Sequence, residues 1–555
     1  MPHATVPSPG LQAIILCGPG ESLSTFTSIP KDFPKALVPI ANRPMVWYPL
    51  DWCYRMGIND ITLVTPPESQ QALESALATH PALTSLPSPK PELIAPANLT
   101  PTTGTGLLLR LPEVQKAITS DFVVLPCDLI SELDGTRLVQ QWMTLNPLSI
   151  SARGTKRKGG LAVFYPTHGL EGISHKKDET DFIATVPLDV PVVPAPLGSL
   201  RPNIEQLAIA MPTDTLNDKV EDGKGVFQLR SQLSGKYGQV KIKTKHRDAH
   251  FYIFPKWVKD YAAPNEKFDS ISEDVLGWWA KAQWQNGLAE KISLDETLGQ
   301  TVDSSEDMES SQLEEPIAVA ATLSTTKTSS LPGKSKSFAS RVGGSAPAPA
   351  IDALDVPPLM AYVQPKPTPT SPQPLIRRVD NSHALLNISL YLAKQQAHQL
   401  GHEHKVHPTA ILAQQARVSQ EDSLVAENVK IGFRSNIKES VIGANCDIGA
   451  SARLTRCLLM DGVTVGDGVQ MVGCIIGRRA RIEGLKLQDP SSAVAEGDKK
   501  KSKKPVEDDD EKTKLTECEV APNFVVEAGT EAKGEKMMPF DTEDMDDLED
   551  DEEED

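Results

Sequence analysis

Residues 11–20 read LQAIILCGPG, and residues 34–45 read PKALVPIANRPM. The first stretch is an apolar run that ends in glycines, which predicts a buried strand followed by a tight turn. Because Gly18 and Gly20 carry no Cβ, the backbone N–H groups of this turn can come close to a phosphate group. We therefore expect a phosphate-binding turn at the end of the first strand.

Short apolar strands alternate with helix-like segments from residue 11 to about residue 295, which predicts a doubly wound α/β domain with a mostly parallel sheet. Ligands of such sheets bind beyond the carboxyl ends of the strands. Gly18, the Gly104–Gly106 segment and Asp128 all fall at predicted strand ends. The further elements that we expect nearby are strands at 61–64 and 122–125 and helices at 45–56 and 68–79.

From residue 425 to 484 the sequence repeats with a period of 17 residues. Three columns of apolar residues stand five or six residues apart, and a glycine follows the first members of one column. This pattern predicts a left-handed parallel β-helix, in which each short strand forms one face of a triangular coil. The columns are Ile431, Ile448, Val465 and Ile482; Ile437, Leu454 and Met471; and Ile442, Leu459 and Ile476.

Residues 520–529 resemble one further coil, so we expect residues 485–514 to be a charged insertion between coils. Lys499–Lys504 in this insertion could contact RNA, but the acidic run 507–511 beside it favours a solvated loop.

Composition predicts segments that do not fold on their own. Residues 296–375 are dominated by Ser, Thr, Pro and Ala, which predicts a disordered linker, and residues 536–555 are expected to form a disordered acidic tail. Residues 541–555 hold twelve Asp/Glu and no Lys/Arg, so the rest of the chain carries only −6 of the net charge of −18. Because the rest of the chain is still acidic, its charge argues against a nucleic-acid-binding domain. The expected domains are therefore 1–295 and 376–535.

The seven cysteines are scattered and form no Cys-x-x-Cys pair, which predicts reduced thiols in a cytosolic protein. Ser440, Cys457 and Cys474 stack at the 17-residue period, and we interpret them as a column of small residues rather than a metal site. The chain has no 18-residue apolar run and no basic N-terminal signal, so neither membrane insertion nor secretion is expected.

Residues 11–46 resemble the nucleotide-binding edge of sugar nucleotidyltransferases. In those enzymes a small hydroxyl residue and an arginine follow the glycines, and a Pro-Lys comes later. This chain keeps Gly18, Gly20 and Lys35, but it places Glu21 and Ser22 at the hydroxyl and arginine positions. Since a carboxylate repels a triphosphate, the resemblance implies a vestigial nucleotide site.

Two further positions bear on that site. In nucleotidyltransferases an aspartate at the position of Asp128 helps to hold Mg²⁺, and a cap for the following turn is an equally good interpretation. A second metal carboxylate is expected near residues 249–253, where the enzymes carry Ala-Gly and this chain has His250. We expect Asp128 to be a vestigial metal ligand and His250 to be a packed residue rather than a base.

The combination of a nucleotidyltransferase-like domain and a left-handed β-helix is similar to the gamma-subunit family of eukaryotic translation initiation factor 2B. PKALVPIANRPM, Leu50–Cys53, Cys127–Ile130 and Phe251–Phe254 carry this resemblance, which covers most of 10–295 and 376–535. It implies a non-catalytic subunit that scaffolds the epsilon subunit in a complex with alpha, beta and delta regulatory subunits. It further implies a role in replacing GDP with GTP on initiation factor 2, without a cofactor and without direct nucleic-acid contact.

Two alternatives belong to other classes. An active sugar-1-phosphate nucleotidyltransferase, similar to GDP-mannose pyrophosphorylase, is disfavoured by Glu21, Ser22 and His250. A β-helix acyltransferase normally needs a catalytic histidine on the solenoid, and no histidine follows His407.

Overall fold

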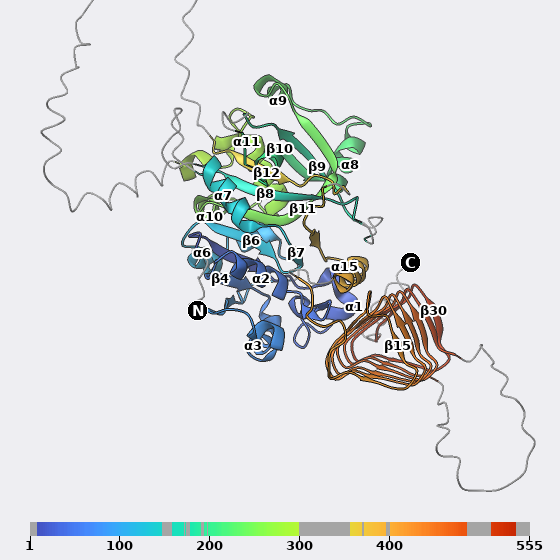
Figure 1. Ribbon diagram of the computed structural model, residues 1–555. Coiled ribbons are helices and arrows are strands. Elements are labelled where there is room, and N and C mark those ends of the chain that lie inside the picture. Colours follow the sequence, from blue (N-terminus) through green and yellow to red (C-terminus); the bar gives the residue numbers. More distant parts are fainter. Residues whose placement is uncertain are drawn as a thin grey trace, which may run out of the picture.

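The computed structural model describes residues 8–298, 356–484 and 512–539. Within these ranges, residues 101, 147–157, 171–172, 174–177, 190–193, 197, 369–370 and 396–399 are not described. The chain forms an α/β domain and a β-helix that lie side by side (Figure 1). The predictions for residues 299–355, for most of the insertion (485–511) and for the acidic tail from residue 540 lie outside the described residues.

A nine-stranded sheet forms the centre of the α/β domain, with the order β5-β4-β1-β6-β11-β8-β12-β10-β9. The neighbours β5, β4, β1 and β6 are parallel, as are β8 and β12, whereas β11, β10 and the remaining pairs are antiparallel. The sheet is therefore parallel mainly in its first half. Its strands are β1 (Gln12–Leu16), β4 (Ile61–Val64), β5 (Glu92–Ile94), β6 (Phe122–Pro126), β8 (Gly160–Pro166), β9 (Asp181–Val186), β10 (Ile204–Pro212), β11 (Lys241–Phe254) and β12 (Leu359–Val363).

Helices cover both faces of this sheet. Successive residues of a strand point to opposite faces, so Ala13 and Ile15 join one buried core while Ile14 and Leu16 join the other. None of the helices in the described ranges combines the length and the apolar character that a membrane span requires. The helices are α1 (Ser24–Thr27), α2 (Trp47–Arg55), α3 (Gln70–Thr79), α4 (Pro81–Thr84), α5 (Thr105–Leu108), α6 (Pro112–Ala117), α7 (Gly135–Leu145), α8 (Thr213–Asp222), α9 (Ser231–Lys236), α10 (Trp257–Ala262), α11 (Leu276–Ala282), α12 (Leu288–Lys291) and α15 (Ser382–Lys394).

The end of the expected linker is part of the α/β domain, so the predicted boundary at residue 375 is wrong. β12 is fully buried and pairs with β8 on one side and β10 on the other. A second short strand, β13 (Ile376–Arg378), pairs with β7 (Leu129–Ser131). The apolar run LMAYV at 359–363 is only five residues long. The Ser/Thr/Pro-rich composition of the surrounding segment masked it.

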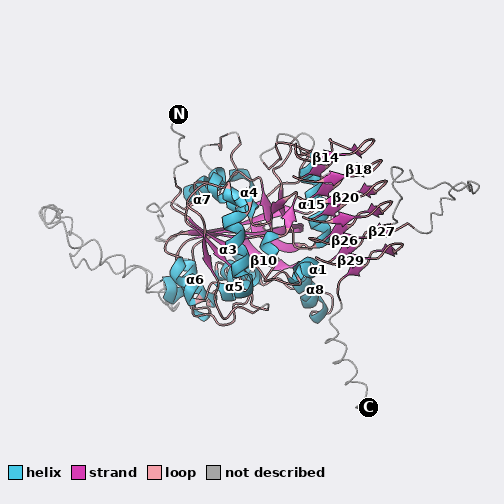
Figure 2. Cartoon of the chain, turned by 90° about the horizontal axis from the view of Figure 1, so that it is seen from below, coloured by secondary structure: helices cyan, strands magenta, loops and turns pink. Residues whose placement is uncertain are grey.

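The second part of the chain is the expected β-helix, built from three six-stranded parallel sheets that form its three faces (Figure 2). The register confirms the 17-residue columns, because Ile431 pairs with Ile448, Ile448 with Val465, and Val465 with Ile482. One face consists of β14 (Ile411–Leu412), β17 (Lys430–Ile431), β20 (Asp447–Ile448), β23 (Thr464–Val465), β26 (Arg481–Ile482) and β29 (Val525–Val526). The second consists of β15 (Arg417–Val418), β18 (Asn436–Lys438), β21 (Arg453–Thr455), β24 (Gln470–Val472), β27 (Lys514–Thr516) and β30 (Glu531–Lys533). The third consists of β16 (Leu424–Val425), β19 (Val441–Ile442), β22 (Leu458–Leu459), β25 (Ile475–Ile476), β28 (Glu519–Val520) and β31 (Lys536–Met537).

The column of glycines is required by the spacing of the coils. A Cβ added at Gly432 would lie 2.6 Å from the carbonyl carbon of Gly449, which is too close for any side chain. The stack also continues across the insertion, since Met471 pairs with Leu515, 44 residues later instead of 17. The insertion ends before β27, which begins at Lys514, and the last strand reaches Met537 rather than residue 535.

The α/β domain covers the third face of the β-helix. On the other two faces the outward positions are mostly polar, but here both residues of each strand are apolar in four successive coils. The outward residues Leu424, Val441, Leu458 and Ile475 belong to the same buried core as β1 and α2. The apolar doublets are therefore a sequence signal for a covered face.

The second half of the PKALVPIANRPM stretch contributes to this contact. β2 (Pro39–Ile40) and β3 (Arg43–Pro44) form a short hairpin. Asn42 at its tip donates a hydrogen bond of 2.9 Å to the carbonyl oxygen of Ile442, and Arg43 donates to those of Leu400 (2.8 Å) and Gly401 (3.0 Å). The hairpin thus holds the α/β domain against the β-helix.

Candidate functional site

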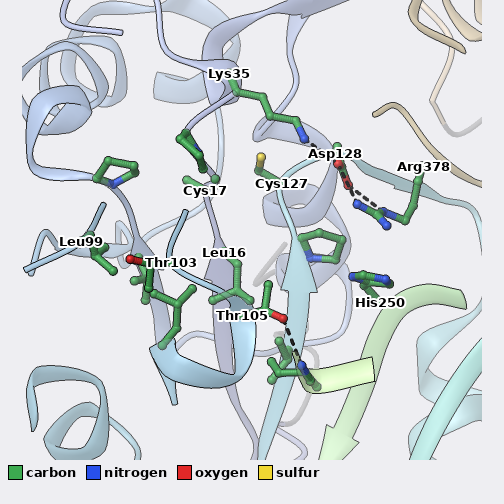
Figure 3. Close-up of a pocket in the computed structure, with 18 of the residues that line it drawn as sticks. Leu16, Cys17, Lys35, Leu99, Thr103, Thr105, Cys127, Asp128, His250 and Arg378 are labelled. Carbon is green, nitrogen blue, oxygen red and sulfur yellow. Dashed lines mark hydrogen bonds and ion pairs between the residues drawn. The ribbon is translucent and has the colours of Figure 1, made fainter. Parts of the chain in front are cut away.

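A cavity of about 190 Å³ lies at the carboxyl ends of β1, β4 and β6, the edge at which an α/β sheet binds its ligands (Figure 3). Apolar residues form much of its wall, and Thr100, Thr103 and Thr105 also line it. Gly18, Lys35 and Asp128, which the sequence assigns to the nucleotide site, all line it. The other lining residues used below are Cys17, Cys127, His250, Tyr252 and Arg378.

The two glycines of the turn have different roles. A Cβ at Gly18 would meet no atom within 4 Å, so the backbone there faces open space. Gly20 has a φ of 103°, and a Cβ there would lie 2.7 Å from the hydroxyl oxygen of Thr27. That hydroxyl donates a hydrogen bond of 2.9 Å to the carbonyl oxygen of Gly20. Gly20 therefore closes the turn, and it lines a neighbouring cavity together with the exposed Glu21.

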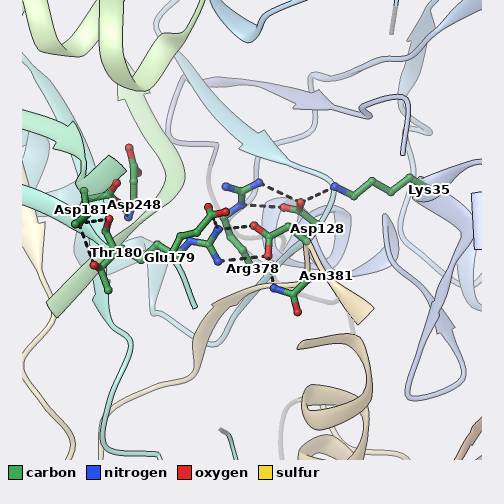
Figure 4. A network of polar contacts seen from close by, with 11 residues as sticks. Lys35, Asp128, Glu179, Thr180, Asp181, Asp248, Arg378 and Asn381 are labelled. Carbon is green, nitrogen blue, oxygen red and sulfur yellow. Dashed lines mark hydrogen bonds and ion pairs between the residues drawn. The ribbon is translucent and has the colours of Figure 1, made fainter. Parts of the chain in front are cut away.

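The carboxylate of Asp128 is buried and is held by two cationic side chains (Figure 4). The ammonium group of Lys35 lies 2.8 Å from its Oδ2 atom. Arg378 donates from Nε to Oδ1 and from Nη2 to Oδ2, both at 3.2 Å. Although burial opposes ionisation, Arg378 and Lys35 hold the pKa of Asp128 well below its usual range. Asp128 is therefore a carboxylate whose two oxygens are both paired.

Arg378 reaches the cavity on a segment that crosses the strand ends. β13 pairs with β7, and the backbone N–H of Val379 donates to the carbonyl oxygen of Asp128 at 2.9 Å. One residue further on, Asp380 accepts from Arg247 at 2.5 Å. The segment that carries Arg378 follows β12 in the sequence. The cavity at the end of β6 is therefore completed by a residue that lies far from β6 along the chain. Nothing in the local pattern around Arg378 indicated this role.

A second carboxylate, Asp248, lies on β11 where the sequence suggested a second metal ligand. Its Oδ2 accepts from the hydroxyl of Tyr252 at 2.7 Å, and its Oδ1 accepts from the backbone N–H of His250 at 2.8 Å. Burial and the nearby Asp181 raise the pKa of Asp248 to about 7. Burial also raises the pKa of Asp181 to about 6. The surroundings of Asp128 thus favour its ionised form, whereas those of Asp248 and Asp181 favour their protonated forms.

His250 replaces the glycine of the enzymes and keeps a glycine-like backbone, with a φ of 49°. Its ring stacks on Tyr252 with the centroids 6.1 Å apart, and it lines the cavity. Burial and Arg378 lower the pKa of His250 well below its usual value, so the ring is neutral at physiological pH. The histidine fills space beside Asp128.

The described residues do not fit a divalent metal ion at this position. Mg²⁺ needs carboxylate oxygens that are free to bind it, but both oxygens of Asp128 contact cations and Asp248 is engaged by Tyr252 and His250. Within the described ranges, no group of three or more His, Cys, Asp and Glu side chains could hold a metal ion.

Comparisons with known proteins agree with both parts of the architecture. Residues 12–157 match the nucleotidyl transferase family, and residues 419–496 match a family described as the GMPPB C-terminal domain. Translation initiation factor eIF2B subunit gamma of Schizosaccharomyces pombe (strain 972 / ATCC 24843) is 25% identical over 291 residues. The chain is similar to an eIF2B gamma subunit.

That match covers 52% of this chain and 55% of the relative, so it spans about half of each protein. It confirms the resemblance inferred from the sequence, and the match at residues 12–157 indicates a nucleotidyl transferase domain.

Proposed function

We propose that this chain is a non-catalytic subunit of the guanine-nucleotide exchange factor for initiation factor 2. In this proposal it supports the replacement of GDP by GTP, scaffolds the epsilon subunit and binds the substrate factor. The complex also contains alpha, beta and delta subunits and acts in the cytosol. Exchange needs no bond to be made or broken; it needs binding energy that favours the state with an opened nucleotide site.

The pairing of Asp128 with both Lys35 and Arg378 carries the non-catalytic part of this proposal. Transfer of a nucleotidyl group requires preorganised positive charge at the phosphates. The loop has Glu21 and Ser22 at the positions where the enzymes have a hydroxyl residue and an arginine. Both cations of the described cavity are already paired with a carboxylate. A triphosphate entering here would have to break these ion pairs.

The similarity to the eIF2B gamma subunit supports the choice of partners. The apolar third face of the β-helix and the hairpin at Asn42 fix the two domains to each other. Such a fixed arrangement suits a protein that presents surfaces from both domains at once. The two remaining faces of the β-helix are mostly polar on the outside and are available for partners.

Purification of the native chain from its own cells is the first test. Co-purification of four further subunits, with the epsilon subunit among them, is the expected result. A chain that purifies alone or with unrelated proteins would contradict the proposal.

A reconstituted complex allows a sharper test of mechanism. Lys35→Ala is expected to lower GDP release from initiation factor 2 by less than about twofold, because in this proposal the cavity is not used in exchange. Ile448→Asp is expected to lower it strongly, because it disrupts a coil of the β-helix. A large defect in Lys35→Ala with normal assembly would mean that the cavity binds a functional ligand.

The family matches favour one other candidate, an active sugar-1-phosphate nucleotidyltransferase similar to GDP-mannose pyrophosphorylase. The purified chain with mannose 1-phosphate, GTP and Mg²⁺ is expected to release no pyrophosphate. Turnover that scales with protein concentration, and that Asp128→Asn abolishes, would establish this alternative in place of the non-catalytic role.

A further inference from the structure

Two cysteines stand side by side at the carboxyl end of the central sheet. Cys17 directly follows β1 and Cys127 directly follows β6. These strands are parallel neighbours, with Leu16 opposite Pro126, so the next residue on each strand is also opposite its partner. The backbone N–H of Cys127 donates to the carbonyl oxygen of Leu16 at 3.0 Å, which fixes this register.

The two thiols also share one face of the sheet. Cys17 and Cys127 belong to the same core as Ile15 and Leu125, the residues two positions earlier on each strand. Neighbouring strands lie about 4.8 Å apart, which falls within the range of about 4.4–6.8 Å between the Cα atoms of a disulfide. Strand spacing therefore places the two thiols within reach of each other.

Both residues line the cavity described above, next to Lys35 (Figure 3). A small oxidant that enters this cavity is therefore brought next to both residues. The reactivity of a cysteine depends on its thiolate fraction and on access, and the cavity beside these two residues supplies a route for the oxidant. We propose that Cys17 and Cys127 form a reversible dithiol–disulfide site for which a hydroperoxide is the oxidant.

The reaction balances in two steps. One cysteine sulfur attacks the peroxide oxygen as the thiolate, which breaks the O–O bond and gives a sulfenic acid and hydroxide, or alkoxide from an organic hydroperoxide. The second thiol then attacks the sulfenic sulfur, which forms the S–S bond and releases the sulfenic oxygen as water with the proton of this thiol. The proton of the first thiol neutralises the hydroxide or alkoxide. Two electrons pass from the sulfurs to the peroxide, and a dithiol reductant reverses the change.

The β-helix supplies a matched pair without a cavity. Cys457 and Cys474 are also neighbours on parallel strands, since they precede Leu458 and Ile475, which pair with each other. Both are buried, and each Sγ contacts a carbonyl oxygen of its own coil, that of Thr455 at 3.3 Å and that of Val472 at 3.4 Å. Neither lines the cavity that Cys17 and Cys127 line. Both pairs lie on neighbouring parallel strands, and they differ in that only Cys17 and Cys127 line this cavity.

The experiment uses the folded full chain, reduced and then treated with hydrogen peroxide, alkylated, digested and analysed by mass spectrometry. A peptide that links Cys17 to Cys127, with the loss of two hydrogen atoms, is expected and should disappear after treatment with dithiothreitol. Its formation should be at least about tenfold faster than that of any Cys457–Cys474 link, because only the first pair is accessible. Equal rates at the two pairs, or free thiols at 17 and 127, would overturn the proposal.

Serine variants test the order of events. Cys17→Ser and Cys127→Ser should each stop at a sulfenic acid on the remaining cysteine, which the diketone dimedone traps. Cys457→Ser should leave the linked peptide unchanged. If either cavity variant fails to fold, the mapping of the unmodified chain decides the question alone.

Discussion

The β-helix and the nine-stranded sheet are both built from buried strands, but their neighbouring strands lie at very different distances along the chain. In the β-helix, Ile448 pairs with Val465, 17 residues later. In the sheet, Gly160 pairs with Leu359, 199 residues later. A short and repeated spacing is visible in the sequence itself, whereas a single distant pairing leaves no periodic trace. Substitutions in the β-helix are therefore expected to affect stability through residues nearby in the sequence, whereas substitutions in the sheet affect it through contacts between distant segments.

The largest expected effect is in the repeat. Ile448→Asp places an unpaired charge in an inward column of aliphatic residues and is expected to lower the free energy of unfolding by about 4 kcal/mol or more. Val472→Asp is the matched control, because Val472 is an outward residue of the same β-helix with 46% of its surface exposed. It should change the free energy by less than about 1 kcal/mol. Urea denaturation of both variants measures the difference, and similar losses would contradict the assignment of the columns.

The next effect tests the long-range contact. Arg378→Ala leaves the buried carboxylate of Asp128 with Lys35 as its remaining cationic partner and is expected to cost about 3 kcal/mol of unfolding free energy. Arg137→Ala, which removes an exposed ion pair with Asp134 on α7, should cost less than about 0.5 kcal/mol.

A double-mutant cycle separates the ion pair from other roles of Arg378. In an Asp128→Asn background, Arg378→Ala should cost at least about 1 kcal/mol less than in the native chain. An unchanged cost would show that Arg378 stabilises the domain through something other than Asp128.

A smaller effect concerns pH. The pKa of Asp248 is about 7 in the folded chain, which is above the value of about 3.9 for an unfolded aspartate. The folded state therefore binds this proton more tightly, so its contribution to stability is complete below about pH 4 and is lost as the pH rises through about 7.

Asp248→Asn removes this titration. The free energy of unfolding of the native chain should fall by about 2–3 kcal/mol between pH 5 and pH 8, and that of the variant should fall less. Denaturation at several pH values measures both curves. Asp447→Asn, at an exposed position on the β-helix, serves as the control and should follow the native curve. Parallel curves for Asp248→Asn and the native chain would rule out the raised pKa.

The smallest effect is expected from removal of residues 541–555. These residues hold twelve acidic groups and little that could be buried. The free energy of unfolding should change by less than about 0.5 kcal/mol, and the shortened chain should still join its partners. Association rates measured at low and high salt should differ between the two chains only at low salt, where screening is weak. A shortened chain that fails to assemble would contradict this.

The sequence predicted what depends on local pattern. The columns through Ile448 and the strand at 61–64 followed from apolar periodicity. Of the residues that the sequence assigns to the vestigial nucleotide site, Gly18, Lys35 and Asp128 line one cavity, whereas Gly20 lines a neighbouring one. Arg378 was missed because its partner is 250 residues earlier, a distance at which no pattern in a single sequence connects two charges. Asp248 was missed as the source of the second carboxylate because its contacts depend on the backbone at His250, which has a positive φ.

The position of β12 has a consequence for how the chain is made and handled. A fragment ending at residue 295, where composition alone suggests a boundary, would lack a strand from the middle of the sheet and would expose the edges of β8 and β10. During synthesis, residues 296–378 must still be translated before β12 and Arg378 are present, which at about 5–20 residues per second takes roughly 4–17 s. Throughout that interval the nascent domain has two open strand edges, a state in which chaperone binding protects against wrong pairing.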